Sequence, residues 1–153
     1  MKTLIITLLL LTPLTVLAEP EVINETRDGN LYERIFNVIA EDLNLSEADI
    51  KIVVSDFDDY SIRTYGITKR ESKELFTVKI KEQVLSRENK IRVFIHEMVH
   101  VSQMYDRRLR SLPAAVWFEG ELYANDVPYY DRPYEIEADK MERMLYAKYK
   151  NRL

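Results

Sequence analysis

One segment, residues 87–106, constrains the fold of this 153-residue chain more than any other. Ser86 precedes the segment in the position of an N-cap, and Glu88 places a favourable acidic charge in the first turn. The apolar residues of the segment recur with the period of an α-helix, at Ile91, Phe94, Ile95, Met98 and Val99. The pattern therefore predicts a long helix with one face in the core.

The same segment holds both histidines of the chain, in the run VFIHEMVHVSQ (residues 93–103). A helix turns by about 100° per residue, so His96 and His100 project from one face about one turn apart. This HExxH spacing is typical of two zinc ligands, with Glu97 beside them as a general base. Zinc lowers the pKa of a bound water to about 7, and the base takes its proton during attack on a peptide carbonyl.

The HExxH pattern is weak evidence when it stands alone. It arises by accident in on the order of one chain in a few hundred, and a buried histidine is usually a hydrogen-bonded core residue. A catalytic zinc ion needs three protein ligands and one open position. A third ligand downstream is therefore the deciding feature.

The stretch RPYEIEAD (residues 132–139) supplies a candidate for that ligand. Glu135 and Asp139 are four residues apart on a predicted helix, where Glu135 can bind the metal and Asp139 can orient a ligating imidazole. By itself such a stretch is typical of an acidic, solvated helix face. Downstream of HExxH it favours a site of His96, His100 and Glu135 that holds one zinc ion per chain.

The N-terminus predicts export. Lys2 gives a positive start, residues 4–17 are mostly aliphatic, and Ala18 ends a small-residue cleavage pattern. We therefore expect a signal peptide over residues 1–18, one domain over residues 19–153, and a periplasmic or secreted product without stable membrane insertion. The chain has no cysteine, so its core must hold without disulfides. The formal net charge of −4 gives no electrostatic basis for binding nucleic acid.

Periodicity along the chain predicts an α+β fold with a small, mostly antiparallel sheet. Asp28 or Asn30 can cap the first helix, Asn44 can end it, and Asp131 can cap the last helix, which has Pro133 in its first turn. The expected elements are a helix over 31–43, strands over 50–54 and 75–81, the helix over 87–106, a hairpin over 115–124 and a helix over 133–150.

The strand over residues 75–81 has a predicted function of its own. Its apolar residues Phe76, Val78 and Ile80 alternate with polar ones, Thr77, Lys79 and Lys81. We expect the apolar residues to face the core and the polar residues to face solvent, with the lysines at a sheet edge. Such an edge could pair with an extended peptide substrate.

Together the two motifs resemble the gluzincin class of zinc metallopeptidases, in which HExxH supplies two ligands and a glutamate on a second helix supplies the third. The run VWFEGELYANDVPYYDRPYEIEAD (residues 116–139) is also similar to small bacterial and phage-type HExxH proteins. The resemblance covers roughly residues 91–144. It implies a minimal zincin-like domain with His96, His100 and Glu135 as ligands, Glu97 as the base and Asp139 as the partner of a ligand.

Two other glutamates compete with Glu135. Glu119 follows His100 with 18 residues between them, a spacing that aminopeptidase-like gluzincins also show, but it falls at the tip of the predicted hairpin. Glu137 points about 200° around the helix from Glu135. We favour Glu135 and keep Glu119 and Glu137 as alternatives.

The predicted function is an exported zinc metallopeptidase that acts on a peptide or protein substrate. The chain has no third histidine, so the expected donor to the oxyanion is a tyrosine between the motifs: Tyr123, Tyr129, Tyr130 or Tyr134. The alternatives are a catalytically silent zinc-binding domain and a zinc hydrolase of a non-peptide amide, such as cell-wall material. Because Glu97 is intact, an enzyme is favoured over a silent domain.

Overall fold

The structure is a computed structural model and describes residues 19–57 and 64–153. The predicted signal peptide, residues 1–18, lies outside this part of the chain. The described residues form an α+β fold, which confirms the predicted class. The helices are α1 (Leu31–Ile39), α2 (Arg87–Tyr105) and α3 (Pro133–Tyr149), with short 3-10 turns η1 (Glu82–Val84) and η2 (Tyr129–Asp131). The strands are β1 (Glu21–Asn24), β2 (Lys51–Asp56), β3 (Gly66–Arg70), β4 (Leu75–Ile80), β5 (Leu109–Ser111), β6 (Ala115–Phe118) and β7 (Glu121–Ala124).

The larger sheet is mixed and has the order β1-β2-β4-β3. Both β1 and β4 run parallel to β2, and only β3 is antiparallel to its neighbour. The prediction of a mostly antiparallel sheet is therefore wrong for this sheet. The physical reason is the connection through α1, since a helix between β1 and β2 lets the second strand return in the same direction as the first.

Strand β4 lies between β2 and β3, so the prediction that it forms a sheet edge is wrong. Phe76, Val78 and Ile80 are fully buried, as predicted. Lys81, which we expected in solvent, is also buried, and its Nζ lies 5.5 Å from the centre of the Phe57 ring. The edge strands are β1 and β3, and the sequence predicted neither of them.

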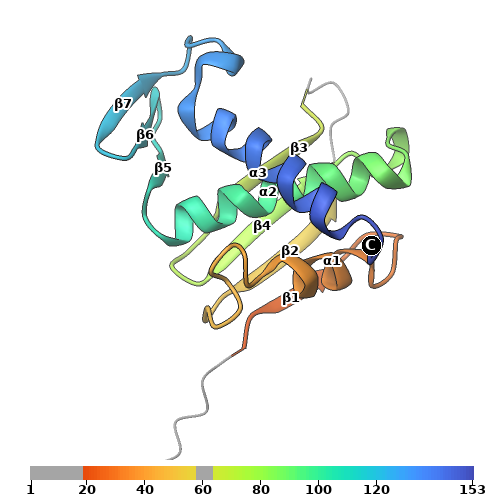
Figure 1. The fold of residues 1–153 in the computed structure, drawn as a ribbon. Helices are drawn as coiled ribbons and strands as arrows, with labels where there is room; N and C mark the ends of the chain where they lie inside the picture. Colours follow the sequence, from red (N-terminus) through yellow and green to blue (C-terminus); the bar gives the residue numbers. More distant parts are fainter. Residues whose placement is uncertain (1–18, 58–63) are drawn as a thin grey trace, which may run out of the picture.

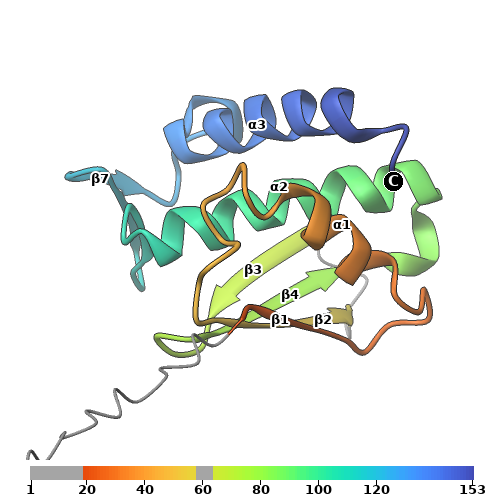
Figure 2. The same cartoon turned by 60° about the horizontal axis from the view of Figure 1, so that its bottom comes forward.

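The helices cover one face of the larger sheet. Helices α1 and α2 pack on the sheet, and α3 lies against α2 on the side away from it (Figures 1 and 2). The core between these layers contains large, fully buried side chains, among them Tyr32, Ile35, Phe36, Ile52, Phe76, Phe94, Ile95 and Met98. This packing fixes α2 between the sheet and α3, so residues on α2 can meet both β3 and α3.

The smaller sheet is antiparallel, with the order β5-β6-β7. The predicted hairpin is confirmed, and its two-residue turn is Glu119-Gly120. Both turn residues have positive φ, 48° for Glu119 and 96° for Gly120, as a type I′ turn requires. This sheet extends from the end of α2 and places the hairpin near the start of α3 (Figure 1).

The helix ends agree only in part with prediction. The Ser86 hydroxyl accepts a hydrogen bond from the N–H of Asn89 at 3.3 Å, which confirms the cap of α2. Asn44 has a φ of 56° and ends the turns that follow α1. Asp131 is not the cap of α3: Arg132 holds that position, and Pro133 follows in the first turn. No helix in the described part of the chain is long and apolar enough to cross a membrane.

Candidate metal centre

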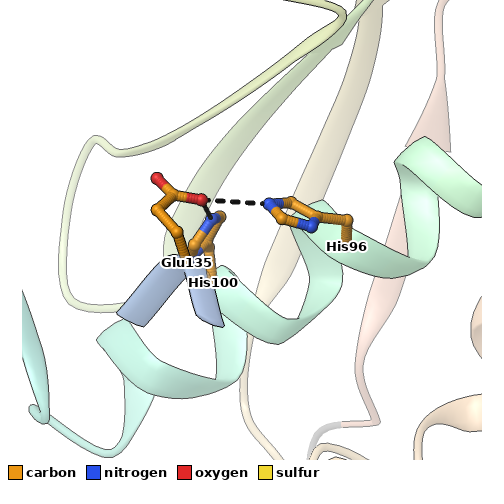
Figure 3. A group of neighbouring side chains, drawn as sticks. All are labelled: His96, His100 and Glu135. Atoms are coloured by element: carbon orange, nitrogen blue, oxygen red, sulfur yellow. Dashed lines mark hydrogen bonds and ion pairs between the residues drawn. The ribbon is translucent and has the colours of Figure 1, made fainter. Parts of the chain in front are cut away.

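Helices α2 and α3 bring His96, His100 and Glu135 together. Figure 3 shows the two imidazoles of α2 and the carboxylate of α3 pointing toward one another. The Nε2 atoms of His96 and His100 each lie 3.2 Å from Oε2 of Glu135. The three ligand atoms lie within 4.8 Å of one another, so this group could hold a metal ion. The predicted ligand set is therefore assembled in space.

The far nitrogen of each imidazole has its own acceptor. Nδ1 of His96 lies 3.3 Å from Oδ1 of Asp139, and Nδ1 of His100 lies 2.8 Å from Oε1 of Gln103. The Gln103 amide is oriented because its nitrogen donates to the carbonyl of Tyr134 at 3.1 Å. When each neutral imidazole carries its proton on Nδ1, both Nε2 lone pairs face the carboxylate of Glu135.

This donor set fits a cation. In that tautomer two imidazole lone pairs and one carboxylate converge with no proton between them. Burial lowers the pKa of His100, but the hydrogen bond with Glu135 and the charges of Glu97 and Glu135 outweigh it and raise the pKa to about 9. Burial raises the pKa of Glu135, but the two histidines hold it well below its usual range. In the absence of metal, a proton on His100 partly replaces the positive charge.

Glu97 lies next to the cluster and is held from the β3 side. Its Oε2 accepts a hydrogen bond from the Thr68 hydroxyl at 2.6 Å. Burial raises the pKa of Glu97, and the charge of His100 and the Thr68 hydrogen bond offset only part of that rise. A carboxylate with a raised pKa, at a fixed position beside two imidazoles, is suited to accept a proton.

Gly66 allows β3 to approach Glu97. A Cβ built at Gly66 would lie 2.8 Å from Cγ of Glu97 and from Cγ1 of Val93, and even closer to Oε1 of Glu97. Real Cβ atoms do not make contacts this short, so the close approach of β3 to α2 requires glycine here. Neither Gly66 nor Thr68 was predicted as a site residue, because the strand that carries them gave no pattern in the sequence.

The two rival glutamates have another partner. Arg108, just after α2, binds Glu119 through Nε at 2.8 Å and Glu137 through Nη1 at 2.9 Å. The hydrogen bond with Glu137, followed by that with Glu119, raises the pKa of the Arg108 guanidinium. The carboxylates of Glu119 and Glu137 are therefore paired with Arg108, whereas the carboxylate of Glu135 faces the histidines.

One of the four candidate tyrosines reaches the cluster. The Tyr129 hydroxyl lies 3.5 Å from Nε2 of His96. Burial and the charges of Glu135 and Asp139 raise the pKa of Tyr129, so its hydroxyl keeps its proton at neutral pH. For the other three, no hydrogen bond to the cluster is found in the described residues: the Tyr123 hydroxyl donates to Glu121, Tyr130 is 81% exposed, and Tyr134 packs its ring near the His100 ring.

Two clefts meet at the cluster. The first has a volume of about 350 Å³ and lies between β3, the hairpin sheet and the start of α3. The second has a volume of about 780 Å³ and lies between β3, the start of α2 and α3. Gly66, His96, Glu97 and Tyr129 line both clefts, so a long substrate could pass over the cluster from one cleft to the other.

Comparisons with family models, with curated proteins and with solved structures found no match to this chain.

Proposed function

We propose that this chain is a zinc metallopeptidase with a minimal, zincin-like domain. The observation that supports this most is the convergence of His96, His100 and Glu135 beside Glu97, where the two clefts meet. Two imidazoles and one carboxylate suit zinc, with a position left for water or substrate. Zinc in this place would lower the pKa of water and polarise a carbonyl.

The side chains around the cluster would handle the proton and the developing charge. Glu97 would accept the proton of the attacking water at its carboxylate, with Thr68 keeping that carboxylate in place. The Tyr129 hydroxyl is the nearest tyrosine donor and would stabilise the oxyanion of the substrate carbonyl. Asp139 and Gln103 would keep the two imidazoles in the orientation and tautomer that binding requires.

The free edge of β3 is the proposed place for the substrate backbone. The N–H of Lys81 donates to the carbonyl of Tyr65 at 3.0 Å, just before β3 begins. In an antiparallel pair, the backbone N–H and C=O groups of successive residues point alternately toward and away from the neighbouring strand. Ile67 therefore bonds to β4, whereas the backbone groups of Gly66 and Thr68 point away from it. Both of these residues line the first cleft, so an extended peptide there could pair with β3.

The first experiment combines elemental analysis with a peptidase assay. We expect about one zinc per chain in the purified protein, and loss of the metal in His96→Ala. Glu97→Gln should keep zinc and fold but lose hydrolysis of an unstructured protein substrate by orders of magnitude. Glu88→Gln, an exposed change on the same helix, is the matched control and should retain activity.

The outcomes separate the proposed function from its alternatives. A folded protein that takes up no zinc, or that binds iron in its place, would overturn the proposal. Stoichiometric zinc without hydrolysis of any peptide would favour a silent binding domain or a hydrolase of another amide. Loss of zinc from Glu97→Gln as complete as that from His96→Ala would make Glu97 a ligand.

A further inference from the structure

Arg132 is the only arginine of the described residues that lines the first cleft. It lies just before α3 and is half-buried. Its Nε donates to the carbonyl of Val127 at 2.9 Å, and its Nη2 donates to the carbonyl of Asn125 at 3.1 Å. Two neutral backbone acceptors therefore fix the direction of the guanidinium without neutralising its charge.

Other arginines near the centre are neutralised. Arg92 lines the second cleft and binds Glu142 at 2.6 Å, and Arg108 binds two glutamates. Arg132 forms no ion pair with a carboxylate in the described ranges 19–57 and 64–153. A half-buried cation without a counter-ion costs free energy, so a fixed, unpaired guanidinium in a cleft is a candidate anion site.

Two features of the surroundings agree with a site for part of a substrate. Tyr134 lines the first cleft together with Arg132. The rest of the first cleft, beyond the metal cluster, has apolar walls from Met104, Leu109 and Val116. Apolar walls around a fixed cation strengthen its attraction for a carboxylate.

Arg132 lies one helical turn before Glu135, whose N–H donates to the Arg132 carbonyl at 3.1 Å. Residues three apart in a helix are separated by about 5 Å along the axis, and an extended peptide advances about 3.3 Å per residue. Arg132 and Glu135 both line the first cleft, so a charge held by Arg132 would lie within a few residues of a bond placed over the metal cluster.

We propose that Arg132 binds a carboxylate of the substrate in the first cleft, within a few residues of the bond that is hydrolysed. This rests on the proposed peptidase function. The carboxylate can be the free C-terminus of a peptide or the side chain of an acidic residue. The first source makes the enzyme a carboxypeptidase, and the second makes it an endopeptidase that prefers acidic residues.

Paired peptides distinguish these sources. In one pair, a peptide ending in a free carboxylate is compared with the same peptide ending in an amide. In the other pair, both peptides end in amides, and one member has glutamate where the other has glutamine. This comparison is repeated with the glutamate at each of the two positions on either side of the bond. We expect the wild-type protein to prefer the carboxylate member of one pair by about tenfold or more.

Three variants test Arg132 itself. Arg132→Gln removes the charge and should abolish the preference, with little change for the neutral peptides. Arg132→Lys keeps the charge without the planar fork and should retain part of the preference. Arg143→Gln, an exposed change on the same helix α3, is the control and should behave as wild type. Zinc content is measured for each variant, because a displaced α3 would also displace Glu135.

A second measurement does not depend on turnover. Calorimetry with zinc-loaded Glu97→Gln compares binding of the same paired peptides, with and without Arg132→Gln. A carboxylate preference that survives Arg132→Gln would come from the metal itself and would overturn the inference. Equal binding of carboxylate and neutral peptides to the Glu97→Gln protein that retains Arg132 would also overturn the inference. If no peptide is hydrolysed but the preference appears in binding and needs Arg132, the peptidase proposal fails and the carboxylate site stands.

Discussion

The Thr68 hydroxyl on β3 and the Glu97 carboxylate on α2 form a hydrogen bond of 2.6 Å, although the two residues are 29 positions apart. This bond joins the free edge of the sheet to the helix that bears both histidines. It holds one oxygen of the carboxylate, and the hydroxyl stabilises the charged form of Glu97. The candidate base is therefore positioned by the strand that we propose for substrate binding.

The first prediction concerns that hydrogen bond. Thr68→Val keeps the shape of the side chain and removes the hydroxyl. Hydrolysis at neutral pH should fall about ten- to a hundredfold, since a hydrogen bond to a charged group contributes about 1.5–3 kcal/mol. The Thr68 bond lowers the pKa of Glu97, so its removal should move the acidic limb of the pH profile of kcat/KM to higher pH. Zinc content should not change.

Thr77→Val is the matched control for this substitution. Thr77 lies on β4 opposite Lys69 of β3, and the side-chain hydrogen bond that Glu97 accepts comes from Thr68. Its substitution should leave the pH profile in place. An unshifted acidic limb in Thr68→Val, with activity reduced equally at every pH, would show that Thr68 supports the fold and does not tune Glu97.

The second prediction concerns Gly66. In Gly66→Ala the new methyl group would overlap Glu97 and Val93, so β3 and α2 must separate or Glu97 must move. We expect a free energy of unfolding lower by about 1–3 kcal/mol and a loss of hydrolysis larger than that in Thr68→Val. Denaturant unfolding and kcat/KM check the two effects.

Gly120→Ala provides the contrasting control. A Cβ at Gly120 meets no atom within 4 Å, but the residue has a φ of 96°, which strains alanine. It should reduce stability by about 1 kcal/mol or more and leave hydrolysis unchanged. If Gly66→Ala showed the same pattern as Gly120→Ala, close packing at Gly66 would have no part in positioning Glu97.

Prediction from the sequence succeeded where the signal was local. The two histidines and Glu97 share one turn of one helix, so spacing alone set their relative positions. The hairpin turn was also local, because Glu119-Gly120 must supply two residues with positive φ. In these cases a few consecutive residues determine the local geometry, and tertiary packing does not alter that geometry.

Prediction failed where the outcome depends on which strands lie side by side in the sheet. Alternation in β4 showed which side chains face the core, but a central strand and an edge strand can share the same alternation. The neighbours of β4 are β2 and β3, and the polar, weakly patterned residues of β3 gave no strand signal. For this reason Gly66, Thr68 and the edge position of β3 were missed. Pairing across the sheet is a property of separate segments.

The third ligand shows a similar limit. Three glutamates fitted the sequence, and helical phase separated only Glu135 from Glu137. Arg108 completes the separation, because it binds both Glu119 and Glu137. Its position just after α2 gave no hint of this function, since the partner carboxylates lie 11 and 29 residues away.

The third prediction follows from this arrangement. Glu135→Gln should weaken zinc binding by more than 100-fold, because the amide oxygen is a poor substitute for a carboxylate ligand. Glu119→Gln and Glu137→Gln should retain stoichiometric zinc and lose at most about 1 kcal/mol of stability each, as expected for partly exposed ion pairs. Competition with a chelator measures all three affinities. Retention of zinc by Glu135→Gln together with loss in either of the others would reassign the third ligand.

The last prediction is a dependence on pH. The pKa of His100 in the metal-free protein is raised to about 9 from an ordinary value of 6.5. The folded state therefore binds this proton more tightly than the unfolded state, and the resulting stability is fully present below about pH 6.5. It is lost as the pH rises through about 9. Denaturant unfolding of metal-free protein should show a falling free energy of unfolding across this range.

The same proton has to leave when metal binds, because only a neutral imidazole can be a ligand. Zinc binding at pH 7.5 should therefore release about one proton, measured by calorimetry in two buffers with different ionisation enthalpies. The metal-free His100→Gln variant, which keeps a polar side chain but cannot titrate, serves as the control and should lose the fall in stability. Metal-free wild-type protein whose stability rises between pH 6.5 and 9, or zinc binding that is independent of the buffer, would contradict a protonated His100 and place the counter-charge of Glu135 on another group.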